Sequence, residues 1–356
     1  MNLVKNKAQL AEKPLVSFVL FAYNQSSFIR EAIEGAFSQT YSNLEIILSD
    51  DCSTDDTFQI MQAVASEYSG PHRLILNRNV DNTGIGGHIN KCMELSSGEL
   101  IIIAAGDDVS LPERTEKTVE HWQNKDRQYM SIYTDAYVID ESGHVIEERE
   151  KRFPSDPVRM LLNSGRVLGC SHAWDRQLFT KFGPLMDNLT YEDRALPFRA
   201  LLLGEVLKIN EPLVKYRLCD SHWRKGDSLS REDSWRRDAI HYVELWLITY
   251  KQMIADYQTW CSDDDKIMGV LSGLRAKKKL ELSLLKKEHR EALRQTFSSE
   301  NAKNFKWHIK AWRTYAVAVI NATNSGSRLL DFFQSLRRFA KKTKRYFKQD
   351  TIAVRP

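Results

Sequence analysis

"LVSFVLFAYNQSSFIREAIEGAFSQTYSNLEIILSDD", residues 15–51, contains three elements with different apolar periods, and their order decides the fold. Residues 15–23 form a nearly continuous apolar run with aromatic and β-branched side chains, which predicts a strand buried on both faces. Residues 26–39 repeat apolar side chains at helical spacing. Residues 44–51 predict a second buried strand, so the segment has the strand–helix–strand order of a parallel sheet.

The same alternation continues along the next fifty residues. The spacing of apolar residues predicts a helix over 55–68, a strand over 73–79, a helix over 86–96 and a strand over 99–105. This order predicts an α/β fold with a mostly parallel central sheet and helices on both faces. In such folds ligands bind at the carboxyl ends of the strands.

Beyond residue 112 the pattern changes, and from about residue 235 it becomes strongly helical. The sequence therefore predicts a catalytic α/β domain followed by a helical C-terminal region. We expect these parts: an N-terminal extension, 1–13; the catalytic domain, 14–230, with a nucleotide-binding half, 14–112, and an acceptor half, 113–230; a helical region, 231–325; and a basic amphipathic tail, 326–356.

Composition excludes several classes of protein. A net charge of +4 over 356 residues gives no argument for nucleic-acid binding, so no nucleic-acid partner is expected. The five cysteines have no zinc-ligand spacing and predict free thiols in a reducing compartment, the cytoplasm. The sequence has neither the apolar core of a signal peptide nor an apolar run of membrane-spanning length, so any membrane contact is expected to be peripheral.

Acidic residues follow two of the predicted strands directly. Asp50 and Asp51 end one strand, and Asp107 and Asp108 end another. Because the carboxyl ends of parallel strands share one edge of the sheet, both acidic pairs are expected to face one crevice. Simpler explanations are also open, since Gly-Asp-Asp is common in turns and acids are favoured at the start of helices.

These clusters, in their order and context, resemble the family 2 inverting glycosyltransferases, which have the GT-A fold. The segments that carry the resemblance lie within residues 14–220: "AYN" (22–24), "SQTYSNLEIILSDDCSTD" (38–55), "NTG" (82–84), and "ED" (192–193) followed by Arg199 and Gly204. The resemblance is to enzymes of bacterial surface polysaccharide synthesis, such as O-antigen or capsule. It implies transfer of a sugar from a UDP- or dTDP-sugar to a lipid-linked glycan.

The resemblance assigns roles to the acids at the strand ends. A departing nucleoside diphosphate needs its negative charge neutralised, and a hard divalent cation held by carboxylates can do this. Asp107 matches the ligand of Mg²⁺ or Mn²⁺, and Asp108 would orient the site or bind the sugar. Asp51 matches the residue that accepts a hydrogen bond from the nucleotide base. Ala22 and Tyr23 are expected to lie against that base through backbone groups.

The remaining candidates lie later in the chain. Asp193 matches the general base that takes the proton of the acceptor hydroxyl, although an acid there could also simply favour the N-terminus of a helix. Asn82 is also expected to bind the donor, near its nucleotide base. Arg217 and His222 belong to a basic segment expected to close over the diphosphate, with a solvated basic loop as the alternative.

Two positions depart from the pattern of the family. Ala105 stands where the first acid of an Asp-x-Asp triplet is usual, and Ile89 stands where an arginine is usual. These departures leave open a catalytically impaired module that binds nucleotide sugars. A Mg²⁺-dependent nucleotidyltransferase is a further alternative, although the start of the chain lacks a Gly-rich phosphate loop.

The C-terminal tail has a basic amphipathic pattern. Its apolar residues fall on one helical stripe over 327–350, and seven lysines or arginines lie between 337 and 348. Such a helix fits the surface of an anionic bilayer, which would place the protein on the inner face of the cytoplasmic membrane. A helix packed on the catalytic domain is the alternative.

Overall fold

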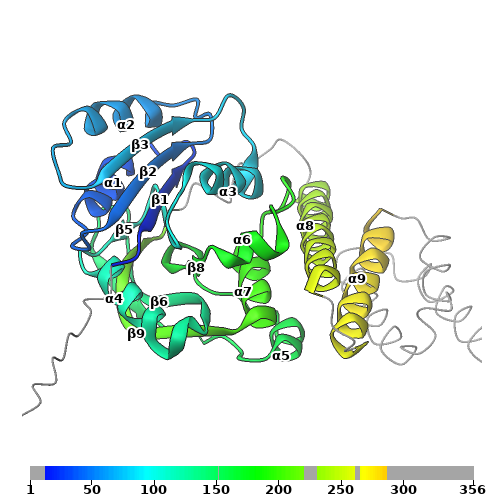
Figure 1. Cartoon of the computed structure of the whole chain (residues 1–356). Helices are drawn as coiled ribbons and strands as arrows, with labels where there is room; N and C mark the ends of the chain where they lie inside the picture. The colour runs from blue at the N-terminus through cyan, green and yellow to red at the C-terminus, as the bar shows by residue number, and fades with distance from the viewer. Residues whose placement is uncertain (1–12, 151, 220–230, 261–264, 287–356) are drawn as a thin grey trace, which may run out of the picture. The chain divides into compact units, whose positions relative to one another are not determined.

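A mixed nine-stranded sheet forms the centre of the protein (Figure 1). The computed structural model describes residues 13–150, 152–219, 231–260 and 265–286. The strands follow one another across the sheet in the order β3-β2-β1-β4-β8-β6-β9-β5, and β7 pairs with β6. Their bounds are β1 (Val16–Ala22), β2 (Leu44–Asp50), β3 (Arg73–Arg78), β4 (Leu100–Ala105), β5 (Val109–Ser110), β6 (Tyr129–Ile139), β7 (Val145–Arg149), β8 (Ala173–Asp175) and β9 (Glu205–Arg217).

Four parallel strands, β3, β2, β1 and β4, form the half of the sheet that ends in acids. Val16 of β1 lies opposite Leu44 of β2 and Leu100 of β4, so the three parallel strands start in register. Their carboxyl ends therefore lie together at one edge of the sheet. β8 runs antiparallel to both β4 and β6, and β6 pairs in parallel with β9. The predicted α/β fold with a mostly parallel central sheet is confirmed.

Helices cover both faces of this sheet. One hydrophobic cluster joins the strands to α1, α2 and α4, and a second joins them to α3, α6 and α7. The helices are α1 (Ile29–Phe37), α2 (Thr57–Ser66), α3 (Gly84–Leu95), α4 (Arg114–Gln123), α5 (Pro157–Leu162), α6 (Gln177–Phe182), α7 (Glu192–Leu203), α8 (Arg231–Trp260) and α9 (Asp265–Leu285), with short 3-10 turns at Asn124–Arg127 and Gly169–Ser171.

The alternation of side chains in β1 explains why its sequence is apolar throughout. Phe18 and Leu20 enter the cluster with α1 and α2, whereas Val19 enters the cluster with α3. All three are at most 1% exposed. Complete burial of such a side chain stabilises the fold by roughly 1.5–3 kcal/mol, so strands of this kind fix the centre of the sheet.

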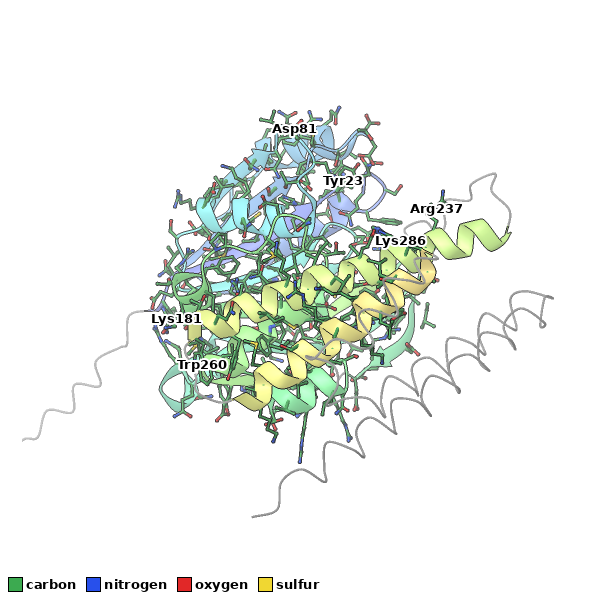
Figure 2. The ribbon with its side chains drawn as sticks, turned by 90° about the vertical axis from the view of Figure 1, so that its right-hand side faces the viewer. Tyr23, Asp81, Lys181, Arg237, Trp260 and Lys286 are labelled. Carbon is green, nitrogen blue, oxygen red and sulfur yellow. The ribbon has the colours of Figure 1, made fainter. Side chains whose placement is uncertain are left out.

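A third cluster joins α8 and α9 to α7. Trp246, Tyr250 and Leu271 pack with Phe198 and Leu202 of α7. A buried ion pair, Arg199 Nη2 to Asp256 Oδ1 at 2.9 Å, crosses the same contact. Figure 2 shows α8 and α9 side by side on this face of the protein.

The chain divides into two compact units, 1–227 with 241–278, and 228–240 with 279–356. The sheet, the three clusters and the site described below all belong to the first unit. In the second unit the structure describes residues 231–240 and 279–286, which are helical up to Leu285. The domain boundaries expected from the sequence remain predictions.

Several expectations concern residues outside the described part of the chain. The N-terminal extension up to residue 12, His222 and the basic stripe over 327–350 are among them. Within the described residues, no helix combines the length and apolar character needed to cross a bilayer.

Candidate active site

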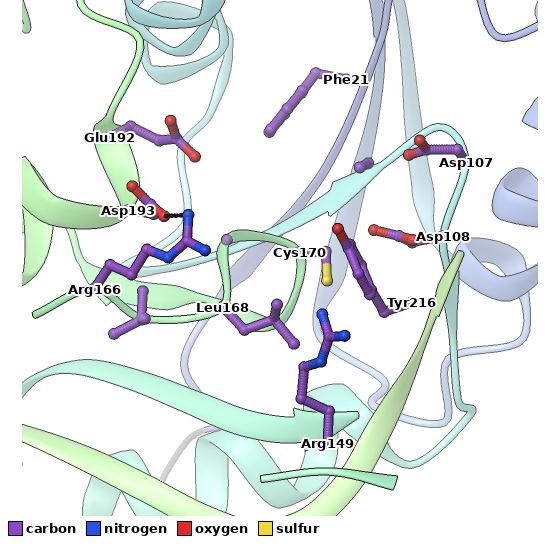
Figure 3. A pocket seen from close by; sticks show the side chains of 13 residues that line it. Phe21, Asp107, Asp108, Arg149, Arg166, Leu168, Cys170, Glu192, Asp193 and Tyr216 are labelled. Atoms are coloured by element: carbon purple, nitrogen blue, oxygen red, sulfur yellow. Dashed lines mark ion pairs between the residues drawn. The ribbon is translucent and has the colours of Figure 1, made fainter. Parts of the chain in front are cut away.

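Acidic residues from distant parts of the chain meet in one cavity of about 280 Å³ (Figure 3). One wall comes from the turn after β4, and the opposite wall comes from the first turn of α7. The cavity is lined by Phe21, Ala105, Asp107, Asp108, Arg149, Arg166, Val167, Leu168, Gly169, Cys170, Glu192, Asp193 and Tyr216. The structure thus brings together the predicted metal ligand, its acidic neighbour and the predicted base.

The turn after β4 lies tightly against the end of β1. The N–H of Gly106 donates to the Phe21 carbonyl at 3.1 Å. A Cβ at Gly106 would lie 2.6 Å from Oε1 of Gln25 and 2.9 Å from Cβ of Ala22. Glycine is therefore needed for the strand to turn here and direct the next two residues to the cavity.

Arg217 holds this acidic turn in place. Its backbone N–H donates to Asp108 Oδ1 at 2.7 Å, and its Nε donates to the Asp107 carbonyl at 3.0 Å. The same guanidinium donates to the carbonyls of Asp140 and Glu141 and to Glu31 Oε2 at 2.6 Å. The Arg217 side chain is fully buried. Contact with a donor diphosphate therefore remains a prediction, whereas support of the acidic turn is observed.

Burial and mutual repulsion make the charged form of Asp108 unfavourable. Burial and then the charge of Asp107 raise the pKa of Asp108 to about 8. A neighbouring positive charge would relieve both the burial cost and the repulsion. Within the described residues, no three His, Cys, Asp or Glu side chains are grouped as a complete metal site. One or two carboxylates suit a hard ion such as Mg²⁺ that takes its other ligands from substrate phosphates and water.

Asp193 reaches the cavity because α7 starts there. Glu192 and Asp193 occupy the first helical turn, where negative charge is favoured by the helix dipole. Pro197 has no N–H to bond to the carbonyl of Asp193, four residues earlier. That carbonyl instead accepts the N–H of Val167 at 3.1 Å, which ties α7 to the loop that forms the cavity wall.

Glu192 lies beside the predicted base, and Gly169 leaves room for it. A Cβ at Gly169 would lie only 3.1 Å from Glu192 Oε1. Burial and then the charge of Asp193 raise the pKa of Glu192 to about 8. Glu192 therefore keeps its proton to a higher pH than an ordinary glutamate does.

Replacing Glu192 should stabilise the protein at high pH. The folded protein retains the Glu192 proton up to about pH 8, whereas the unfolded chain releases it near its ordinary pKa of 4.5. The contribution of Glu192 to the free energy of unfolding therefore falls as the pH rises from 4.5 to about 8. We expect Glu192→Gln to raise the melting temperature by about 2–4 °C at pH 8.5 and by little at pH 5.

Thermal unfolding at both pH values, in EDTA, measures this effect. Glu120→Gln, an exposed position on α4, is the matched control and should give equal melting temperatures throughout. A Glu192→Gln protein that is less stable at pH 8.5 than the unaltered chain would contradict the expected pKa.

Two arginines that sequence reasoning missed also line the cavity. Arg166 lies next to the base, with Nη1 3.8 Å from Asp193 Oδ2. Arg149, at the end of β7, lies over the ring of Tyr216 at 5.2 Å. Neither arginine follows a parallel strand or an acidic motif, so no sequence pattern indicated that they line the cavity.

Asp51 lies at the same edge of the sheet but does not line this cavity. Its Oδ1 accepts from the backbone N–H and hydroxyl of Thr83 at 3.0 and 2.9 Å and from Asn79 at 2.7 Å. Its Oδ2 accepts the N–H of Gly84 at 2.9 Å. The carboxylate thus orders the loop before α3, and its contact with a nucleotide base remains a prediction.

The other donor-binding candidates lie around Asp51. The carbonyl of Ala22 accepts the N–H of Asp51 at 2.9 Å. Tyr23 is 44% exposed and lies at the surface of the nucleotide-binding half (Figure 2). Asn82 is exposed, and its Oδ1 accepts the N–H of Gly84 at 3.1 Å. Their positions are compatible with a nucleotide beside β1, and their roles remain predictions.

The two departures from the expected pattern lie in different places. Ala105 lines the cavity directly before the acidic turn. Ile89 is 2% exposed and belongs to the hydrophobic cluster under α3. The side chain of Ile89 therefore packs in the core. Alanine at position 105 gives the site one carboxyl group fewer than the usual Asp-x-Asp triplet would.

Comparison with known proteins finds a family similar to the region that contains Asp107 and Asp108, whereas Glu192 and Asp193 lie beyond that region. Residues 17–181 match the model of the family described as "Glycosyl transferase family 2". EpsE of Bacillus subtilis (strain 168), named as a glycosyltransferase, is 38% identical over 130 residues. That match covers 36% of this chain and 46% of EpsE, so the chain spans less than half of the relative's length.

Two solved structures share the fold over most of the chain. TarS 1-349 of S. aureus, in complex with UDP-GlcNAc, has a TM-score of 0.51 at 14% identity, covering 84% of this chain and 92% of that one. The mannosyltransferase PcManGT from Pyrobaculum calidifontis, in complex with GDP-Man and Mn²⁺, has a TM-score of 0.50 at 14% identity, covering 95% and 84%. Residues 17–181 are therefore similar to glycosyltransferase family 2, within a chain that shares the α/β fold of these two structures.

Proposed function

We propose that this protein is a metal-dependent, inverting glycosyltransferase that moves a sugar from a UDP- or dTDP-sugar to a glycan. One observation carries the proposal. The acidic turn at Asp107 and Asp108 and the carboxyl pair at Glu192 and Asp193 line opposite walls of one cavity. The family of residues 17–181 and the nucleotide sugars bound by TarS and PcManGT support it.

The proposed reaction is a single displacement at the anomeric carbon of the donor. Asp193 accepts the proton of the acceptor hydroxyl while that oxygen attacks the anomeric carbon. The bond from this carbon to the diphosphate oxygen breaks, and its electron pair leaves with the nucleoside diphosphate. Attack opposite to the leaving group inverts the configuration. A base positioned in this way typically contributes about 10²- to 10⁴-fold to the rate.

Asp107 would hold the divalent cation, Mg²⁺ or Mn²⁺, and Asp108 would orient the turn or contact the donor sugar. When bound, such an ion supplies positive charge to the departing diphosphate. The raised pKa of Asp108 and the Mn²⁺ bound by PcManGT support this assignment. Asp51, Ala22, Tyr23, Asn82, Arg217 and His222 complete the proposed donor-binding set.

The acceptor is proposed to be a lipid-linked glycan of bacterial surface polysaccharide synthesis. The basic amphipathic pattern of residues 326–356 supports a peripheral position on the inner face of the cytoplasmic membrane. Flotation with anionic vesicles, with and without these residues, tests the membrane part. Equal binding by both proteins would exclude the tail as the anchor.

Binding of a donor should be detected as stabilisation. A nucleotide sugar at 100 times its Kd stabilises the folded protein by about 2.7 kcal/mol. We expect UDP- or dTDP-sugars with Mn²⁺ to raise the melting temperature, whereas the corresponding free sugars should not. Release of UDP or dTDP from the stabilising donor then measures turnover.

The turnover measurement also separates the second candidate function. Ala105 at the cavity wall favours a module that binds a nucleotide sugar without transferring it. Stabilisation without nucleotide release, over all acceptors tried, would support that module and contradict the enzyme.

A further inference from the structure

We propose that the acceptor carries an anionic group, a carboxylate or a phosphate, close to the hydroxyl that is glycosylated, and that Arg149 and Arg166 bind it. This inference rests on the proposed function and names the class of acceptor. The two guanidiniums line the same cavity as the acidic turn and the carboxyl pair. They enter from parts of the chain outside the nucleotide-binding half.

Arg166 places its charge next to the proposed base. Its Nη1 lies 3.8 Å from Asp193 Oδ2, which is an ion pair but too long for a hydrogen bond (Figure 3). The side chain is 52% exposed, so its donor groups remain accessible to a ligand. An anion bound by Arg166 would therefore lie within one sugar ring of the hydroxyl that Asp193 deprotonates.

Arg149 approaches the cavity from a different element. It comes from the end of β7, and its guanidinium lies over the Tyr216 ring at 5.2 Å. Its ion pair with Glu147, at 3.2 Å, is on the surface, where such pairs contribute little. Figure 3 shows its guanidinium directed towards the cavity, with Leu168 between it and Arg166. The cavity is thus provided with two planar donor groups from separate elements, one on each side of Leu168.

Proximity to Asp193 favours the acceptor over the donor as the source of the anion. The donor diphosphate is expected at Asp107, on the opposite wall of the cavity. On that wall the Arg217 guanidinium already supplies positive charge next to the acidic turn. Arg166 instead shares its position with the residue that must contact the acceptor hydroxyl.

The balance of charge in the cavity supports the same conclusion. Four carboxyl groups line it, and an additional anion would be repelled without nearby positive charge. Arginine is suited to this role because it stays charged and offers a fork of donors. A neutral acceptor would not need two arginine side chains in the cavity.

Direct binding tests the inference without depending on turnover. The probes are methyl glucuronide and methyl phosphate, compared with methyl glucoside, the carboxyl-reduced counterpart of the first. Binding is measured by NMR on the full chain with UDP and the diamagnetic ion Mg²⁺ present, so that the donor site is occupied. We expect at least one anionic probe to bind tenfold or more tightly than methyl glucoside, and Arg166→Gln and Arg149→Gln each to remove that preference.

Arg152→Gln is the matched control, because Arg152 is exposed and does not line the cavity. It should keep the full preference for the anionic probe. Arg166→Lys, which retains the charge without the fork, should give an intermediate preference. Equal binding of charged and neutral probes to the unaltered protein would overturn the inference, and so would a preference that survives both glutamine variants.

A second comparison identifies the source of the anion. If the arginines bind the donor instead, UDP-glucuronic acid should bind more tightly than UDP-glucose, and the glutamine variants should lose that difference while acceptor-probe binding is unchanged. That outcome would overturn the assignment to the acceptor. Failure of the proposed function would look different, because no nucleotide sugar would then bind or turn over in any variant.

Discussion

Asp193→Asn should abolish sugar transfer while leaving the affinity for UDP nearly intact. Asparagine keeps the shape of the side chain but cannot take the proton from an acceptor hydroxyl. The rate of transfer is expected to fall by about 10²- to 10⁴-fold, the usual contribution of a general base. Asp193 lies on the wall opposite the acidic turn, so calorimetry with UDP and Mn²⁺ should give an unchanged Kd.

Asp56→Asn is a suitable control for this change. Asp56 is exposed at the start of α2, and its side chain makes no capping hydrogen bond. Its replacement should affect neither transfer nor UDP binding. Full activity of the Asp193→Asn protein would exclude Asp193 as the base and leave Glu192 as the remaining carboxyl on that wall.

Loss of the cation should have a comparably large effect. Positive charge on the departing diphosphate contributes several kcal/mol to the transition state, and about 1.4 kcal/mol corresponds to a tenfold change in rate. We therefore expect EDTA, or Asp107→Asn, to slow transfer by about 10²- to 10³-fold. Titration with Mn²⁺ or Mg²⁺ should restore the chelated protein fully and the variant only at much higher metal concentration.

The same Asp56→Asn protein controls for general effects of removing a charge. It should need no more metal than the unaltered chain. Transfer that continues unchanged in EDTA would contradict the metal role of Asp107. In that case positive side chains would have to neutralise the diphosphate.

The part of the fold that the sequence predicts well is the part with the simplest apolar patterns. β1, β2 and β4 are short runs that are buried on both faces, so composition alone distinguishes them from helices. β9 was not predicted, because Asn210, Glu211 and Pro212 interrupt its apolar pattern. The structure accommodates them by shifting the register against β6 around Asp135.

The start of α1 shows a similar limit. Serine favours the N-cap position, yet the helix begins at Ile29, after Ser26, Ser27 and Phe28, and Phe28 makes no side-chain capping bond. The backbone N–H groups of Phe28 and Ile29 instead donate to the carbonyl of Gln25. Both serines lie within this turn, so the start of the helix is set by local backbone geometry that composition does not contain.

The residues of the candidate site also differ in how well the sequence predicts their positions. The acids at positions 107, 108 and 193 could be predicted, because strand ends and helix starts have recognisable sequences and the resemblance links them. Arg149 and Arg166 could not, because their place depends on how β7 and the loop before β8 fold over the cavity. The roles of Asp51 and Arg217 illustrate a further limit, since the sequence suggested ligands where the structure shows extensive internal hydrogen bonding.

Pro197 affects how the start of α7, which carries Asp193, is attached to the neighbouring loop that carries Arg166. The bond from Val167 to the carbonyl of Asp193 joins two peptide units that carry neighbouring functional side chains, Arg166 on one and Asp193 on the other. A force applied to the loop through Arg166 would reach the start of α7 through this bond, through the ion pair of Arg166 with Asp193, and through the bonds of Arg194 to the carbonyls of Ser164 and Gly165. The proposed binding of the acceptor and the orientation of the proposed base would thereby be mechanically linked.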